Sequence, residues 1–131
     1  MKTDYFLTMN STKTQELTRA ELEIMQILWQ LEKGFVNDIL EAMPTPKPAY
    51  NTVSTIVRIL EKKGFVAHRA YGKSHEYYPL ISRTEYTSSF MTSVVNNFFG
   101  GSIGNMVSFL SRDRGIIVSE ADEIIKMLKE K

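Results

Sequence analysis

Apolar residues near the start of the chain recur at intervals of three and four positions. Ile24, Leu28 and Leu31 therefore share one face of a predicted helix over residues 19–32. A capping-box pattern precedes this helix, because Thr18 and Glu21 are spaced so that each side chain can bond the backbone N–H of the other residue. Apolar spacing also predicts a short second helix over residues 36–43 and a third helix over residues 50–63.

Proline and glycine divide the segments around the third helix. Pro44, Pro46 and Pro48 predict a stiff, extended connector before it, since each proline fixes its own φ and restrains the preceding residue. Two β-rich runs, residues 65–70 and 75–80, flank a turn with a glycine and are typical of a hairpin. The predicted order is helix, short helix, proline turn, helix and hairpin, which is the order of a winged helix-turn-helix.

The last third of the chain is again helical in pattern. A second capping box over residues 82–85 precedes a helix that ends at Gly100. A short apolar segment over residues 103–110 is followed by a polar stretch, residues 111–115, which we expect to break it. A last helix is predicted from Ser119 onward, with acidic residues first and lysines last, as the helix dipole favours.

Composition excludes several classes of protein. The 131 residues are 43% hydrophobic and 24% charged, which is an ordinary globular balance. The absence of cysteine excludes disulfides, thiol catalysis and cysteine-based metal sites. No apolar run approaches the roughly 18 residues of a membrane span, and the N-terminus has no apolar core of signal-peptide length. We therefore expect a soluble, cytoplasmic protein that does not insert into the membrane.

Catalytic and metal-binding motifs are not found in the sequence. It contains no glycine-rich phosphate loop and no arrangement of serine, histidine and aspartate at a known nucleophile turn, so we expect neither an enzyme nor a cofactor. His68 and His75 could face each other across the hairpin, but two histidines without carboxylate or thiol support make a poor metal site. No metal site is expected.

The third predicted helix has a polar outer face. With one residue every ~100°, its valine, isoleucine and leucine side chains fall mainly on one side. The opposite side carries hydroxyls, an amide and cations, which reach base edges or phosphates, and arginine can bond guanine through two hydrogen bonds. The whole chain has a net charge of only +1, but residues 44–80 hold six Lys or Arg and two Glu. The candidate DNA-binding residues are Asn51, Thr52, Ser54, Thr55, Arg58 and Lys62 on the helix, and Arg69 and Lys73 on the hairpin.

Three segments of the chain resemble the BlaI/MecI/CopY penicillinase-repressor family. They are residues 17–29 (LTRAELEIMQILW), residues 51–55 (NTVST) with residues 62–64 (KKG), and residues 77–79 (YYP) at the end of the hairpin. The resemblance spans residues 17–131 and implies a cytosolic, homodimeric repressor that binds inverted-repeat operators in double-stranded DNA. It places Asn51, Thr52 and Thr55 at DNA-contacting positions. The chain departs from the family at Ile59, where the family usually carries arginine, which leaves open whether the groove contact or the operator sequence differs.

The apolar residues of the last third exceed what three short helices can bury among themselves. A second copy of the same region is the simplest partner, although packing back onto the N-terminal domain is the alternative. The candidate dimerisation residues are Phe90, Val94, Phe98, Ile103, Val107, Leu110, Ile124, Ile125 and Leu128.

The resemblance also implies a way to release the DNA. In β-lactam-responsive members of the family, a membrane sensor-protease triggers cleavage within the dimerisation region. The matching bond here joins Ser108 to Phe109, although the family has asparagine before the phenylalanine. The copper-sensing branch of the family uses a cysteine cluster, which this chain lacks.

We therefore predict a mainly α fold with a small β-hairpin. An N-terminal tail over residues 1–16 precedes a winged-helix DNA-binding domain, residues 17–81, and a helical dimerisation domain, residues 82–131.

Two alternative functions stay open. A winged-helix protein-interaction module would show exposed aromatic side chains on the outer face of the third helix. Only Tyr50 and Ile59 favour that alternative. A ligand-sensing regulator would hold a small molecule between its two domains. The operator, the regulated genes, the inducing signal and the true start, Met1 or Met9, are not determined by the sequence.

Overall fold

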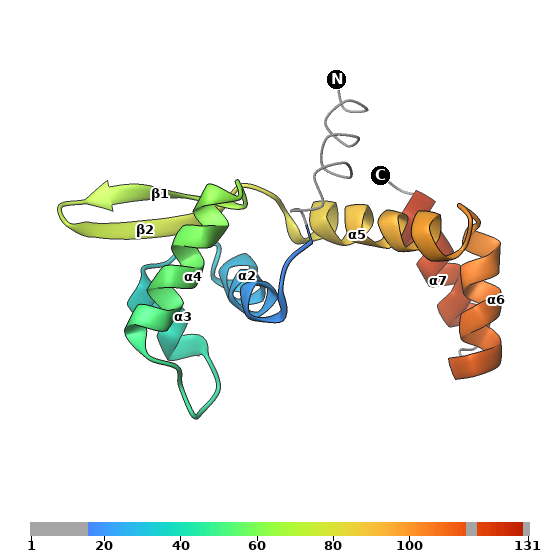
Figure 1. Cartoon of the computed structure of the whole chain (residues 1–131), viewed down its shortest axis with the longest axis horizontal. Helices are drawn as coiled ribbons and strands as arrows, with labels where there is room; N and C mark the ends of the chain where they lie inside the picture. The colour runs from blue at the N-terminus through green and yellow to red at the C-terminus, as the bar shows by residue number, and fades with distance from the viewer. Residues whose placement is uncertain (1–15, 115–117, 130–131) are drawn as a thin grey trace, which may run out of the picture. The chain divides into compact units, whose positions relative to one another are not determined.

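The computed structural model describes residues 16–114 and 118–129 (Figure 1). These residues form two compact units, one that ends at Arg83 and one that begins at Thr84. The fold is mainly helical with one two-stranded antiparallel hairpin, which confirms the predicted fold class. No helix in the described ranges is both long and apolar enough to cross a membrane.

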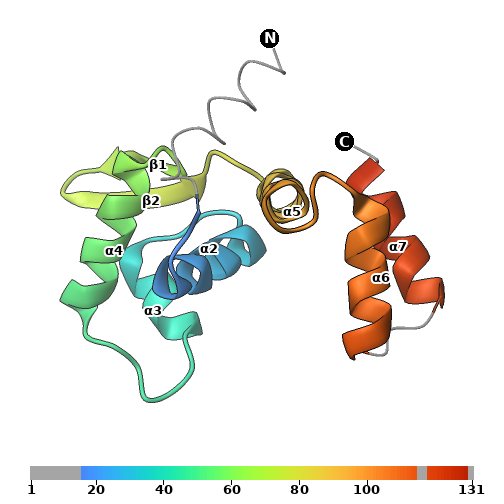
Figure 2. The same cartoon turned by 45° about the vertical axis from the view of Figure 1, so that its right-hand side comes forward.

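The N-terminal unit has the predicted order of elements. Helices α2, α3 and α4 lie together with the hairpin at their edge in both views (Figures 1 and 2). The observed helices end within one residue of the predicted ends. The bounds are α2 (Arg19–Leu31), α3 (Val36–Ala42), α4 (Tyr50–Lys62), β1 (Val66–Tyr71) and β2 (Ser74–Pro79).

Helix α2 begins at the predicted capping box. The backbone N–H of Glu21 donates to Thr18 Oγ1 at 3.2 Å, and the backbone N–H of Thr18 donates to Glu21 Oε1 at 2.9 Å. The same carboxylate accepts hydrogen bonds from Lys63 Nζ, at 2.9 Å to each oxygen. Glu21 therefore connects the start of α2 to the end of α4.

The core of this unit lies where α2, α3 and α4 meet the first strand. Its apolar side chains come from the faces that the periodicity predicts, and α4 packs against both α2 and α3. Side chains with 0–2% exposure form the centre of the core: Ile24, Met25, Leu28, Ile39, Val53, Val57, Leu60, Phe65 and Val66.

The hairpin is attached to the helices through its second strand. The N–H of Gly34 donates to Tyr77 O at 2.9 Å, and the N–H of Tyr77 donates to Gly34 O at 2.8 Å, so the loop after α2 pairs with β2. The Tyr77 side chain is only 4% exposed. Tyr71 and Ser74 are paired across the turn, where Gly72 has φ +63°, a left-handed conformation that glycine adopts without a steric penalty.

The segment after the hairpin contacts α2. The indole Nε1–H of Trp29 donates to Ile81 O at 2.8 Å, and the Arg83 guanidinium lies 5.8 Å from the centre of the Trp29 ring. The chain that leaves β2 is therefore held against the first helix of the unit.

The C-terminal unit contains α5 (Arg83–Phe98) from its second residue onward, α6 (Ile103–Arg114) and α7 (Val118–Lys129). Helices α6 and α7 pack side by side (Figure 2). The expectation that the polar stretch after Leu110 breaks the helix is wrong, because α6 continues to Arg114. Ser111 and the three residues after it include no glycine or proline, so polarity alone does not end the helix. Gly115, the last residue of the expected break, lies outside the described residues.

The Glu21 carboxyl predicts a pH-dependent component of stability. Burial raises the pKa of this carboxyl, but the hydrogen bonds from Thr18 and Lys63 and the lysine charge outweigh burial, so its pKa lies below the ordinary value. A lowered pKa in the folded state adds stability above the unfolded-state value, about 4.3 for glutamate, and that stability is lost as the pH falls through the folded-state value.

We expect Glu21→Gln to lower the free energy of unfolding by about 1–2 kcal/mol at pH 7, because Lys63 and the α2 N-terminus lose a charged acceptor. The difference from wild type should shrink below about pH 4. Urea unfolding from pH 7 to pH 3 measures both effects. The matched control is Glu23→Gln, an exposed position on the same helix, with an effect within about 0.5 kcal/mol. A wild type and Glu21→Gln difference that is constant with pH would contradict the assignment.

Candidate nucleic-acid interface

Helix α4 presents one side to solvent because the other side is in the core. Val53, Val57 and Leu60 are at most 1% exposed, which sets the rotation of the helix about its axis. Asn51, Thr52, Thr55, Arg58 and Lys62 are exposed and Ser54 is half-buried. The structure therefore places all six candidate residues of α4 on or beside its outer face.

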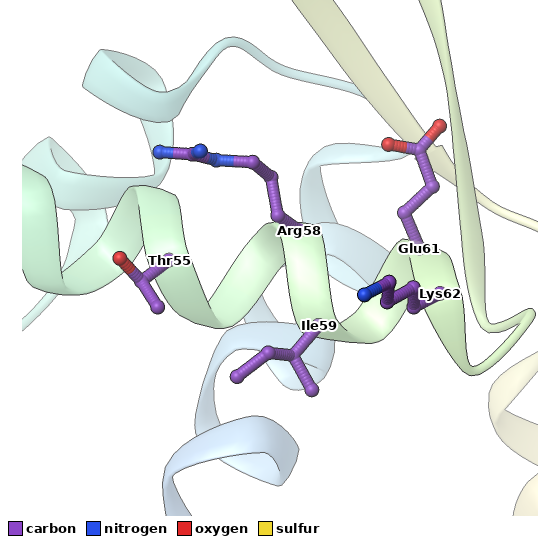
Figure 3. Close-up of a pocket in the computed structure, with 5 residues that line it drawn as sticks. All are labelled: Thr55, Arg58, Ile59, Glu61 and Lys62. Carbon is purple, nitrogen blue, oxygen red and sulfur yellow. The ribbon is translucent and has the colours of Figure 1, made fainter.

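The outer face of α4 divides into two rows. One row faces the hairpin and contains Ser54, Arg58 and Glu61, spaced four and three residues apart. Arg58 donates to Ser54 Oγ at 3.2 Å, and Glu61 Oε2 lies 2.6 Å from His68 Nδ1 on β1. Figure 3 shows Arg58 and Glu61 on one side of the helix and Thr55 and Ile59 toward the other.

The second row, which we call the outer row, contains Asn51, Thr55, Ile59 and Lys62. All four side chains are exposed, and none of them is acidic. The outer row combines an amide, a hydroxyl, a methyl-bearing side chain and a cation, which are residue types that contact base edges and phosphates in a DNA groove.

The row that faces the hairpin forms one wall of a groove. Ser54 and Arg58 line this groove of about 700 Å³ together with the start of α3 and the tip of the hairpin. Lys73 and His75 line it from the hairpin side. The carboxylate of Asp38 also lines the groove and accepts the N–H of Phe35 at 2.9 Å. Two cationic side chains thus flank a concave surface next to α4, an arrangement suited to a phosphate backbone.

The hairpin carries a paired-histidine cluster next to α4. The rings of His68 and His75 are stacked, with centroids 4.0 Å apart and planes within 7°, which confirms that they face each other across the hairpin. His68 also bonds Glu61, so that carboxylate is directed toward the hairpin. The Tyr77 ring lies 5.6 Å from that of His68 and 6.2 Å from that of His75. Burial raises the pKa of the Tyr77 hydroxyl, and the nearby Glu61 charge raises it further.

Not every cation counted in the sequence is available to a ligand. Lys47 Nζ donates to three carbonyl oxygens at the end of α3: Leu40 at 3.2 Å, Glu41 at 2.9 Å and Met43 at 2.6 Å. Lys63 is bound to Glu21.

The predicted cations of the hairpin are accessible. Arg69 and Lys73 are exposed, as the prediction of wing contacts requires. The sequence pattern missed the contribution of Asp38, Tyr50 and Tyr71 to the groove, because only the packing of α3 and the hairpin brings them together.

The candidate dimerisation residues differ in exposure. Phe98 is 76% exposed and Phe90 is 38% exposed in the single chain. The half-buried members are Val94, Ile103, Val107, Leu110, Ile124 and Ile125, and the Leu128 side chain lies outside the described ones. Ser108 and Phe109 are exposed residues within α6, where the Phe109 ring centroid lies 5.6 Å from that of Phe99. Val95 and Met106, which the sequence pattern did not single out, are buried in this unit.

The helices α2–α4 with a hairpin beside the last of them define a winged helix-turn-helix protein. The family model described as penicillinase repressor matches residues 17–130. The chain belongs to the penicillinase repressor family, as the sequence motifs predicted.

Two relatives are similar to this chain over nearly their whole length. The methicillin resistance regulatory protein MecI of Staphylococcus aureus strain N315 is 26% identical over 120 residues, which cover 91% of this chain and 98% of MecI. The penicillinase repressor of Bacillus licheniformis is 29% identical over 120 residues, which cover 90% of this chain and 93% of the relative.

The contacts of Lys47 predict a structural role for a cation that lies close to the candidate interface. Lys47→Ala should lower the free energy of unfolding by about 1 kcal/mol, because carbonyls at the end of α3 lose a charged donor. Lys62→Ala, at an exposed position of the outer row, should change it by less than about 0.5 kcal/mol. Urea unfolding of both variants measures the difference, and equal effects would argue against a structural role for Lys47.

Proposed function

We propose that this protein is a cytoplasmic transcriptional repressor that binds inverted-repeat operators in double-stranded DNA as a homodimer. The observation that carries the proposal is the outer face of α4, where hydroxyl, amide and cationic side chains lie next to a groove flanked by Arg58 and Lys73. Membership of a family whose named relatives are a penicillinase repressor and a methicillin resistance regulator supports the same function.

In this proposal α4 enters the major groove and the hairpin follows the phosphate backbone. Asn51, Thr52 and Thr55 near the start of α4 contact base edges or adjacent phosphates.

The cationic side chains contact phosphates. Arg58 lines the groove of the protein between α4 and the hairpin and bonds Ser54. Its position therefore favours a phosphate contact shared with Lys73 over pairing with guanine. Lys62 and Arg69 add phosphate contacts, which position the protein without specifying sequence.

Dimerisation increases the number of contacts that the protein makes with DNA. A single winged helix contacts few phosphates, whereas two copies related by a two-fold axis match an inverted repeat and about double the contacts. Phe98 and Phe90 expose aromatic surface on α5, which a second copy of the C-terminal unit would cover.

We also propose that proteolysis between Ser108 and Phe109, triggered by a membrane sensor-protease, releases the DNA. Both residues are exposed, but they lie inside α6, so a protease can reach the peptide bond only after this helix unwinds locally. Cleavage would divide the C-terminal unit and remove part of the dimer surface. Intact-mass measurement of the protein from induced cells tests this step, and a full-length chain after complete induction would exclude it.

The DNA-binding proposal predicts a sequence-selective, salt-dependent affinity. Wild type should enrich one inverted repeat from a randomised duplex pool and bind it with a steep negative salt slope. Thr55→Ala should weaken operator binding about three- to tenfold, the effect of one lost hydrogen bond, and change scrambled-duplex binding much less. Fluorescence anisotropy over a salt series measures both. A pool without an enriched sequence would overturn the repressor and favour a protein-interaction module.

The dimer proposal predicts a mass of twice the 15.0 kDa chain in sedimentation equilibrium. Phe98→Ser should raise the dimer dissociation constant at least tenfold, because truncating an aromatic anchor of an interface costs about 2 kcal/mol or more. The matched control is Leu80→Ser, which removes a 56% exposed apolar side chain from the N-terminal unit and should leave the constant unchanged. A monomeric wild type would contradict the proposal.

A further inference from the structure

The outer row of α4 contains one apolar side chain among polar ones. Ile59 is 41% exposed, although isoleucine is usually among the most buried residues in a folded chain. It lies four residues after Thr55 and three before Lys62, so the three side chains follow one another along the helix. The exposed methyl groups of Ile59 are thus part of the surface that we propose meets DNA.

The neighbours of Ile59 favour DNA over another apolar surface. Thr55, Ile59 and Lys62 line a shallow hollow of about 530 Å³ on α4, together with Arg58 and Glu61 (Figure 3). The Glu61 carboxylate is bound to His68 and points toward the hairpin, away from Ile59. A hydroxyl and an ammonium therefore flank the isoleucine, which is a setting for a ligand that presents both an apolar group and negative charge.

Thymine in duplex DNA has this combination of groups. Among the four bases, only thymine presents a methyl group in the major groove, on its C5 atom. The phosphates of both strands border this groove. An isoleucine side chain neither donates nor accepts a hydrogen bond, so it distinguishes bases by burying this methyl group. Arg58 also lines this hollow, but its guanidinium bonds Ser54 in the row that faces the hairpin, so Arg58 does not compete for the same base.

We propose that Ile59 is a specificity-determining residue that contacts the C5-methyl group of a thymine in each half of the operator. The inference rests on the proposed DNA binding and extends it to one chemical feature of one base. It also assigns a role to the position at which the chain carries isoleucine where the family usually has arginine.

Replacing thymine by deoxyuridine tests this contact, because the exchange removes only the C5-methyl group. The duplex is the operator that wild type enriches from a randomised pool, and each thymine is replaced in turn. We expect one position per half-site at which deoxyuridine weakens wild-type binding about fourfold, the effect of exposing one methyl group. Ile59→Ala should bind the thymine duplex about as weakly as wild type binds the deoxyuridine duplex, and should no longer distinguish the two.

Thr55→Ala is the matched control, since it alters the neighbouring side chain of the outer row. It should bind both duplexes more weakly but keep the fourfold preference for thymine at the same position. Ile59→Val, which keeps two methyl groups, should keep most of that preference. Because Ile59 is exposed, none of its variants should change the urea midpoint, and this measurement separates a lost contact from a lost fold.

The outcomes separate the two proposals. In one outcome, an operator is enriched, but each deoxyuridine changes the affinity of wild type and of Ile59→Ala by the same factor. This result overturns the role of Ile59 and leaves DNA binding intact. A pool without any enriched sequence overturns DNA binding and the thymine contact together. Loss of a protein interaction in Ile59→Ala, with operator binding unchanged, would assign the side chain to a protein partner and overturn the inference.

Discussion

The packing of α4 against α2 is the constraint on which the rest of the N-terminal unit depends. Val53, Val57 and Leu60 are buried, and this sets the rotation of α4 about its axis. The ion pair between Glu21 and Lys63 joins the start of α2 to the residue after α4, so it holds the same two helices together at one end. A rotation of α4 by one residue, about 100°, would bury part of its polar face and leave those groups without hydrogen bonds.

The hairpin is positioned by contacts at both of its sides. Its second strand pairs with Gly34 in the loop after α2, and its first strand meets α4 through His68 and Glu61. These contacts create the groove beside α4 and place Lys73 and Arg58 on its walls. The Glu61 bond has a second effect, because it directs the one carboxylate of α4 toward the hairpin and leaves the outer row without an acid.

Positive charge on this unit serves two purposes that the sequence alone does not separate. Lys47 and Lys63 bind carbonyls and a carboxylate of the chain itself, so their charges are partly satisfied internally. Lys62 and Arg69 are exposed, and Arg58 bonds only a neutral hydroxyl in the described structure. Among the Lys and Arg of residues 44–80, those that remain available lie on α4 and the hairpin. The local count of lysine and arginine therefore overstates the number of cationic side chains that are available to a ligand.

Short-range patterns determined most of the secondary structure of this protein. The capping box at Thr18, the apolar spacing of α2 and α4 and the glycine turn of the hairpin act over fewer than about six residues, so the sequence alone predicts them. Polarity was a poor guide to the end of α6, because helix formation tolerates polar residues without glycine or proline.

Tertiary structure decided which polar residues act together. The sequence placed Ser54, Thr55, Arg58 and Lys62 on one face, but only the position of the hairpin divides that face into a row beside the groove and an outer row. The same packing brings the Glu61 carboxylate within hydrogen-bond distance of His68 and leaves Ile59 exposed. Helical periodicity specifies the direction of a side chain around its own axis, whereas its partners depend on contacts between segments far apart in the chain.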